Sequence, residues 1–108
     1  MATGRLATPA QLAATTSTTV YTVPTGYYGI FNVSFTNTGT ASVTIRLALA
    51  TTGTPGSAEW IEYDTVIVPK GVFERTGLVA GAGLNVVAWT NTASAVNVTI
   101  YGIETSTA

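Results

Sequence analysis

The stretch TNTGTASVTIRL, residues 36–47, decides the predicted fold, because a near copy, TNTASAVNVTIY, occupies residues 90–101. Each copy places Thr-Asn-Thr before small residues and then continues with alternating β-branched residues. Asn37 and Asn91 are suited to turns, since an Asn side chain can bond its own backbone and tolerates left-handed geometry. We therefore predict that each copy connects the two strands of a β-hairpin.

The chain around these two predicted hairpins has the composition of β-structure from residue 18 onward. Thr, Val, Ile and aromatic residues dominate, and turn signals recur about every 8–14 residues. Two equivalent hairpins that face one another favour a sandwich of two sheets. We predict an all-β fold, an antiparallel β-sandwich of about seven to eight strands, Ig-like or jelly-roll, over residues 18–108. The predicted strands are 18–23, 28–36, 42–50, 59–67, 72–78, 84–90 and 96–104.

Alternation along these strands predicts which side chains face the core. Phe31 and Phe35 lie on one face of the second strand, and each large core side chain contributes roughly 1.5–3 kcal/mol when buried. In the sixth strand, Val86 and Ala88 are assigned inward, with Val87 and Trp89 as the alternative pair. The predicted core is Phe31, Val33, Phe35, Val43, Ile45, Leu47, Leu49, Ile61, Tyr63, Val86, Ala88, Val98 and Ile100.

The composition excludes several classes of function. The chain of 108 residues has no Cys and no His, which removes thiolate chemistry, disulfides and the most common general base and metal ligand. Charged residues make up 8% of the chain and the net charge is −1, so it has no basic footprint for nucleic acid or an anionic membrane surface. A free monomer normally carries more charge. We therefore expect a component of an assembly, with no cofactor.

Residues 1–17 are small and polar, with Pro9 and no strong periodicity. We predict an extended N-terminal arm, which either frays or docks on a neighbouring subunit. The segment lacks the apolar run of a secretory signal, and no stretch of the chain approaches a membrane-spanning helix. Deletion of residues 1–17 is expected to leave the sandwich intact.

The densest group of functional side chains is the stretch EWIEYD, residues 59–64. On a regular strand, Glu62 and Asp64 share a face about 7 Å apart, a spacing that suits a pair of catalytic carboxylates or part of a calcium site. Arg46 lies on the outer face of the third predicted strand, so a salt bridge at the surface or at an interface is the favoured interpretation. The candidate interface residues are Arg46, Trp60, Glu62, Asp64 and Trp89.

Large aromatic side chains outside the predicted core offer a second interpretation. A planar row of such rings can stack on sugars, although Trp and Tyr are also enriched at subunit interfaces. The aromatic residues in question are Tyr27, Tyr28, Trp60, Trp89 and Tyr101.

The order of these phrases resembles small β-sandwich structural proteins of tailed bacteriophages. The resemblance covers about 85 residues and is carried by YTVPTG (21–26), NTGTASVTIRLA (37–48), WIEYD (60–64) and VNVTIYGIE (96–104). It implies a non-enzymatic virion component, assembled in the host cytoplasm. The favoured role is a capsid decoration (cement) protein, a homo-oligomer and often a trimer, which binds the major capsid protein and stabilises the shell. The alternatives are a tail, neck or fibre adaptor and a carbohydrate-binding module.

Overall fold

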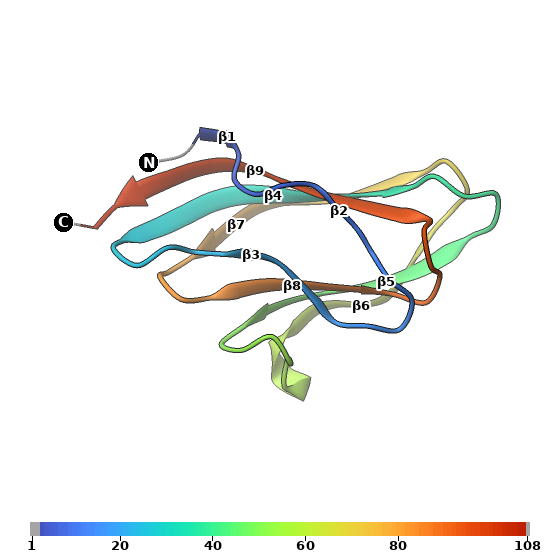
Figure 1. Cartoon of the computed structure of the whole chain (residues 1–108), viewed down its shortest axis with the longest axis horizontal. Helices are drawn as coiled ribbons and strands as arrows, with labels where there is room; N and C mark the ends of the chain where they lie inside the picture. The colour runs from blue at the N-terminus through green and yellow to red at the C-terminus, as the bar shows by residue number, and fades with distance from the viewer. Residues whose placement is uncertain (1–2, 108) are drawn as a thin grey trace.

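The computed structural model describes residues 3–107 as two antiparallel sheets packed face to face (Figure 1). Sheet A has the strand order β1-β9-β4-β7, and β2 also pairs with β9; sheet B has the order β3-β8-β5-β6. Within residues 3–107, one 3-10 turn, η1 (Ser57–Glu59), lies between β5 and β6. No helix among residues 3–107 is long and apolar enough to cross a membrane. The strands are β1 (Thr3–Arg5), β2 (Ala10–Gln11), β3 (Thr18–Thr22), β4 (Tyr27–Asn37), β5 (Val43–Ala50), β6 (Trp60–Ile67), β7 (Val72–Ala80), β8 (Asn85–Thr90) and β9 (Val96–Ser106).

The connections decide between the two predicted sandwich types. From β2 onward, every connection passes from one sheet to the other except that between β5 and β6, which are neighbours in sheet B. An Ig-like sandwich would instead pair the consecutive strands A–B, D–E and F–G within its ABED and CFG sheets. The observed order and crossings form a jelly roll, in which two sheets of four principal strands enclose one core.

All seven predicted strands are confirmed, with boundaries within two residues of the prediction. The two predicted hairpins are wrong. The first Thr-Asn-Thr copy carries the chain from β4 in sheet A to β5 in sheet B, and the second carries it from β8 in sheet B to β9 in sheet A. Because β4 pairs with β9 and β5 pairs with β8, the two connections lie side by side at one end of the sandwich (Figure 1).

The core lies between the two sheets, and most of its predicted members are buried. Leu49 and Ile61 are half-buried and pack against the core. Tyr63 is the error, because 58% of this residue is exposed on the outer face of sheet B. Val86 and Ala88 face inward as predicted, whereas Val87 joins a second buried cluster with Ala48 and Ala50. The confirmed core members are Phe31, Val33, Phe35, Val43, Ile45, Leu47, Val86, Ala88, Val98 and Ile100.

Residues 3–17 form part of the sandwich, so the predicted N-terminal arm is not confirmed. Thr3–Arg5 and Ala10–Gln11 pair with β9, and the chain then crosses to sheet B (Figure 1). Leu12 is only 1% exposed within the core. Deletion of this segment would therefore remove a core side chain and uncover an edge strand, contrary to the expectation that the sandwich would be unaffected. Residues 1 and 2 of the predicted arm, and residue 108, lie outside the described residues.

Candidate functional site

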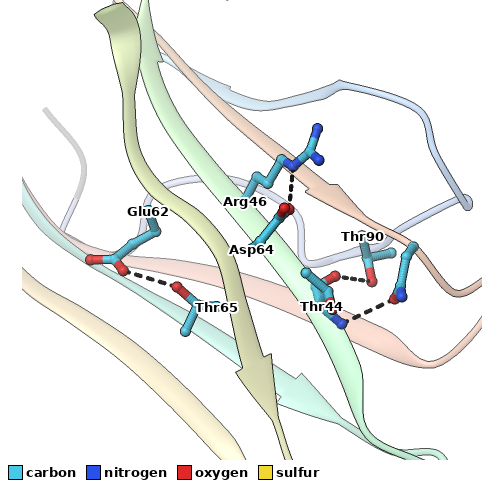
Figure 2. A network of polar contacts seen from close by, with 7 residues as sticks. Thr44, Arg46, Glu62, Asp64, Thr65 and Thr90 are labelled. Carbon is cyan, nitrogen blue, oxygen red and sulfur yellow. Dashed lines mark hydrogen bonds and ion pairs between the residues drawn. The ribbon is translucent and has the colours of Figure 1, made fainter. Parts of the chain in front are cut away.

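Three of the five candidate interface residues meet on the outer face of sheet B. Arg46 on β5 is paired in register with Trp89 on the neighbouring β8. On its other side, Arg46 donates a hydrogen bond of 2.6 Å from Nε to Asp64 Oδ1 on β6 (Figure 2). This hydrogen bond raises the pKa of Arg46, so the guanidinium keeps its charge. The predicted salt bridge between the third and fourth strands is therefore confirmed.

Two aromatic rings flank the Arg46 guanidinium. Its central carbon lies 3.9 Å from the centre of the Trp89 ring and 4.0 Å from the centre of the Tyr63 ring. Both contacts are cation–π interactions, worth about 0.5–1 kcal/mol each at exposed sites. The three side chains come from β8, β5 and β6, so they form one cluster across three strands of sheet B. We call Arg46, Tyr63, Asp64 and Trp89 the arginine cluster.

A β-bulge in β6 separates the two carboxylates that were predicted to share a face. Leu47 pairs with Glu62 and Ile45 pairs with Thr65, so two residues of β6 lie opposite the single residue between Ile45 and Leu47. Asp64 adopts a left-handed conformation with φ 57° within this bulge. As a result, Glu62 and Asp64 project to opposite sides of the strand (Figure 2). The prediction of a carboxylate pair is wrong.

Glu62 instead joins the two sheets at their open side. It forms an ion pair with Arg75 on β7, and it accepts a hydrogen bond of 3.1 Å from Thr65 Oγ1 (Figure 2). Arg75 also donates to the backbone oxygen of Ile61. Because β6 and β7 are the edge strands of sheets B and A, this ion pair links the two layers. Glu62 is therefore placed away from the other candidate interface residues.

Trp60 extends the aromatic surface beyond the arginine cluster. Its ring meets the edge of Tyr63 at a centroid distance of 5.8 Å and an interplanar angle of 70°, and it covers the small buried cluster that contains Val87. Trp60, Tyr63 and Ser57 line a shallow pocket of about 320 Å³. The pocket combines two aromatic walls with one hydroxyl group, a composition suited to a small ligand that has both apolar and polar edges.

The loop that supplies Ser57 is held by Glu59. The Glu59 carboxylate accepts hydrogen bonds from the backbone nitrogens of Gly56, at 2.8 Å, and Thr51, at 3.1 Å. These two bonds lower the pKa of Glu59, because they stabilise its charged form. Glu59 therefore fixes the loop between β5 and β6.

A second polar contact crosses the interior at the end of the sandwich opposite the Thr-Asn-Thr connections. Tyr21 on β3 donates a hydrogen bond of 2.5 Å to Glu104 on β9. Both residues are buried. Burial, and then the hydrogen bond with Glu104, raise the pKa of the Tyr21 hydroxyl well above its ordinary value. This contact links sheets B and A.

Two residues of this surface, Tyr63 and Ser57, were not predicted from the sequence. Alternation placed Tyr63 in the core because it assumed a regular strand. An acidic residue within an apolar strand can occupy the left-handed position of a bulge, so Asp64 was the available signal. Ser57 carries no sequence signal, since it reaches the pocket only through the path of the loop.

Among residues 3–107, no three acidic side chains gather closely enough to hold a metal ion. Comparison with protein families, with curated proteins and with solved structures finds no match for this chain.

Proposed function

We propose that this chain is a non-enzymatic structural protein of a tailed bacteriophage virion. The favoured role is a capsid decoration (cement) protein that forms a homo-oligomer, with a trimer expected, and attaches to the major capsid protein. The sequence phrases described above support this proposal. The jelly-roll topology is compatible with it, because capsid domains and lectin domains both use that fold, although a fold alone does not assign a function.

The observation that carries the proposal is the outer face of sheet A. Ile30 on β4 pairs in register with Val79 on β7 and with Ile103 on β9, so the three aliphatic side chains form a row across three strands. These residues are 40%, 61% and 44% exposed, respectively. In the monomer, no other part of the described chain covers this row.

Charge is scarce on the same face. Among the described residues, its charged side chains are Glu74 on β7 and Arg5 on β1. Glu74 accepts a hydrogen bond from the Tyr101 hydroxyl, which raises the pKa of Tyr101. The remaining outward positions on β4 and β9 are largely Ser, Thr and Asn. A flat face that is poor in charge and carries a central aliphatic row has the composition of the core of a protein interface.

A charge placed in the aliphatic row tests the oligomer. We expect Ile30→Lys to lower the mass measured by light scattering after size exclusion below that of the wild-type oligomer. Val66→Lys is the matched control, because Val66 is 63% exposed on β6 of the other sheet. A wild-type protein that is monomeric at all concentrations, or an Ile30→Lys variant that keeps the wild-type mass, would contradict this use of the face.

Attachment to a shell requires a second measurement. Purified protein is mixed with virions that lack it, and the pellet after sedimentation is quantified. We expect saturable binding in a fixed ratio to the major capsid protein, which Ile30→Lys weakens and Val66→Lys preserves. Binding to isolated tails but not to heads would instead favour the tail or fibre adaptor.

A carbohydrate-binding role is the second candidate, supported by the pocket between Trp60, Tyr63 and Ser57. Aromatic rings stack on the apolar faces of sugars, and the Ser57 hydroxyl can bond a sugar hydroxyl. We expect Tyr63→Ala to abolish any signal on a glycan array, whereas Tyr28→Ala on sheet A keeps it. An array with no signal for the wild-type protein would remove this candidate.

A further inference from the structure

The N-terminal residues 3–14 occupy a groove that runs along the edge of β9. Backbone hydrogen bonds join the Leu6 nitrogen to the Ile100 oxygen at 3.0 Å and the Leu12 nitrogen to the Val96 oxygen at 2.9 Å. The Leu12 oxygen also accepts a bond of 3.4 Å from the Ser94 nitrogen. These contacts act together with the two short pairings of β1 and β2 described above.

Loss of residues 3–14 from the edge of β9 would destabilise the sandwich. β9 spans Val96–Ser106 and pairs with β4 on its other side, so loss of the segment would leave a long unpaired edge. Leu12 lies in the core and is 1% exposed, and the half-buried Leu6 packs against the same core. Without the segment, the Val96 and Ile100 oxygens would lose their donors and an apolar space in the core would open to water.

The hinge between this segment and β3 is strained. Thr15, Thr16 and Ser17 are exposed, and Thr15 has φ 51°. A left-handed conformation is unfavourable for a β-branched residue, because its Cβ substituents crowd the backbone. Thr15 is held there by the turn that returns the chain to its own sheet B, where the Thr15 nitrogen bonds the Thr90 oxygen at 2.8 Å. A segment that docked on another copy would not require this turn at Thr15.

We propose that residues 3–14 exchange between copies, so that the segment of one chain occupies the β9 groove of a second copy. The contacts along β9 are the same whether the occupant belongs to the same chain or to a partner. Exchange releases the left-handed turn at Thr15, and a short hinge under strain favours such an exchange. Reciprocal exchange gives a dimer, and head-to-tail exchange gives a ring where the rotation between copies closes and a filament where it does not. The inference deepens the proposed homo-oligomer but does not depend on attachment to a capsid.

Cysteine pairs across the groove test the exchange directly, because the chain has no Cys of its own. Gln11 and Asn97 are partners in the register of β2 and β9. Gln11→Cys and Asn97→Cys are made in separate chains, one of them isotope-labelled, then refolded together at high concentration and oxidised. We expect a disulfide-linked heterodimer joining positions 11 and 97. A mixture of Gln11→Cys with Val66→Cys, which lies far from the groove, measures the background from random collision.

Two glycine variants at the hinge distinguish release of the Thr15 strain from a general gain in flexibility. Thr15→Gly removes the cost of the left-handed conformation, so the closed monomer gains relative to the exchanged form. We expect it to lower the yield of the 11–97 heterodimer by about fivefold or more. Thr16→Gly adds similar flexibility at the adjacent residue, which does not have a positive φ. It should leave the yield within about twofold of the parent mixture.

Two results would overturn the proposal. One is an 11–97 yield no higher than the Val66 background while the double variant cross-links efficiently within one chain. The other is an equal effect of Thr15→Gly and Thr16→Gly. If either cysteine variant fails to fold, Thr3→Cys and Ile103→Cys provide a second register pair on the same edge. A positive exchange without virion binding would retain this inference and remove the proposed decoration role.

Discussion

The two Thr-Asn-Thr segments have nearly the same sequence and lie at the same end of the sandwich, yet their asparagines differ in burial and in hydrogen-bond partners. Asn37 is fully buried, and its side-chain amide donates to the backbone oxygens of Ala41, Ile67 and Val68 at 2.9–3.2 Å. Asn91 is exposed, and its side-chain oxygen accepts from the backbone nitrogen of Thr44 at 3.0 Å. One asparagine joins two inter-sheet connections, whereas the other caps a single strand.

The difference comes from a shift of one residue relative to the strand. Asn37 is the last residue of β4 and continues the inward set that includes Phe35. In the second copy β8 ends at Thr90, which takes the inward position, and Asn91 begins the connection. Because side chains alternate between faces, a shift of one residue exchanges inside and outside. The same three-residue phrase therefore contributes differently to the free energy of unfolding in its two positions.

The largest test of this comparison is the isosteric change of each Asn to Asp. Asn37→Asp replaces a buried amide donor with a carboxylate that faces three carbonyl oxygens. We expect it to lower the free energy of unfolding by about 3 kcal/mol or more at neutral pH. Asn91→Asp keeps the oxygen that accepts from Thr44, so a loss below about 1 kcal/mol is expected. Urea denaturation of the two variants measures the difference, and equal losses would break the comparison.

Truncation of the same side chains should give a smaller contrast. Asn37→Ala leaves buried carbonyl oxygens without their donor, which costs about 2–3 kcal/mol. Asn91→Ala leaves only groups that water can reach, so about 0.5 kcal/mol or less is expected. Midpoints of chemical denaturation, with unchanged slopes, provide the measurement. A loss at Asn91 as large as that at Asn37 would mean that exposure does not set the cost.

The first threonine of each segment, Thr36 or Thr90, provides a comparison of a single hydroxyl group. Thr90 is buried and donates a hydrogen bond of 3.0 Å to the Thr44 oxygen (Figure 2). Thr36, by contrast, lies on the outer face of sheet A. We expect Thr90→Val to cost about 1 kcal/mol and Thr36→Val to stay within about 0.5 kcal/mol of the wild type. Thermal and urea unfolding of both variants test this order, which a larger loss at Thr36 would reverse.

Alkaline pH should affect the opposite end of the sandwich, which Tyr21 and Glu104 hold together. The unfolded chain releases the Tyr21 proton near its ordinary pKa of 10, while the folded protein retains it. Stability from this group is therefore complete below pH 10 and is lost as the pH rises above it, by at most about 1.4 kcal/mol per pH unit. Denaturation curves from pH 9 to 11 should fall more steeply for the wild type than for Tyr21→Phe. Parallel curves would show that Tyr21 titrates normally.

Sequence patterns located the elements well and their partners poorly. Alternation found seven strands, and most of the predicted core is buried, because a strand with one buried face must alternate. The pairing was missed because it depends on contacts between distant segments: the repeated phrase fits an inter-sheet connection as well as a hairpin. The strands β1 and β2 were missed because they are short and polar, and they pair only through their edge with β9.

The candidate site shows the same division. From the sequence, the candidate interface residues included Arg46, Trp60, Asp64 and Trp89, and these four lie on one face of sheet B. They were identifiable because charged residues and Trp are few in this chain. Tyr63 and Glu62 were misplaced because both lie between two register shifts of β6 against β5, one on each side of Leu47. Each register shift reverses which of the following side chains face the core. Where the shifts occur is decided by the pairing of β6 with β5, which the local sequence does not specify.

By itself, the sequence determined that this protein is all-β, that it has no thiol or imidazole chemistry, and that ten particular side chains are buried in its core. These properties follow from composition and from local periodicity, which each segment carries independently of the others. Only the tertiary structure decided the jelly-roll order, the burial of Asn37 and the docking of residues 3–14 along β9. Those features arise where backbone groups far apart in the chain satisfy one another, and no local pattern specifies which of several possible partners they find.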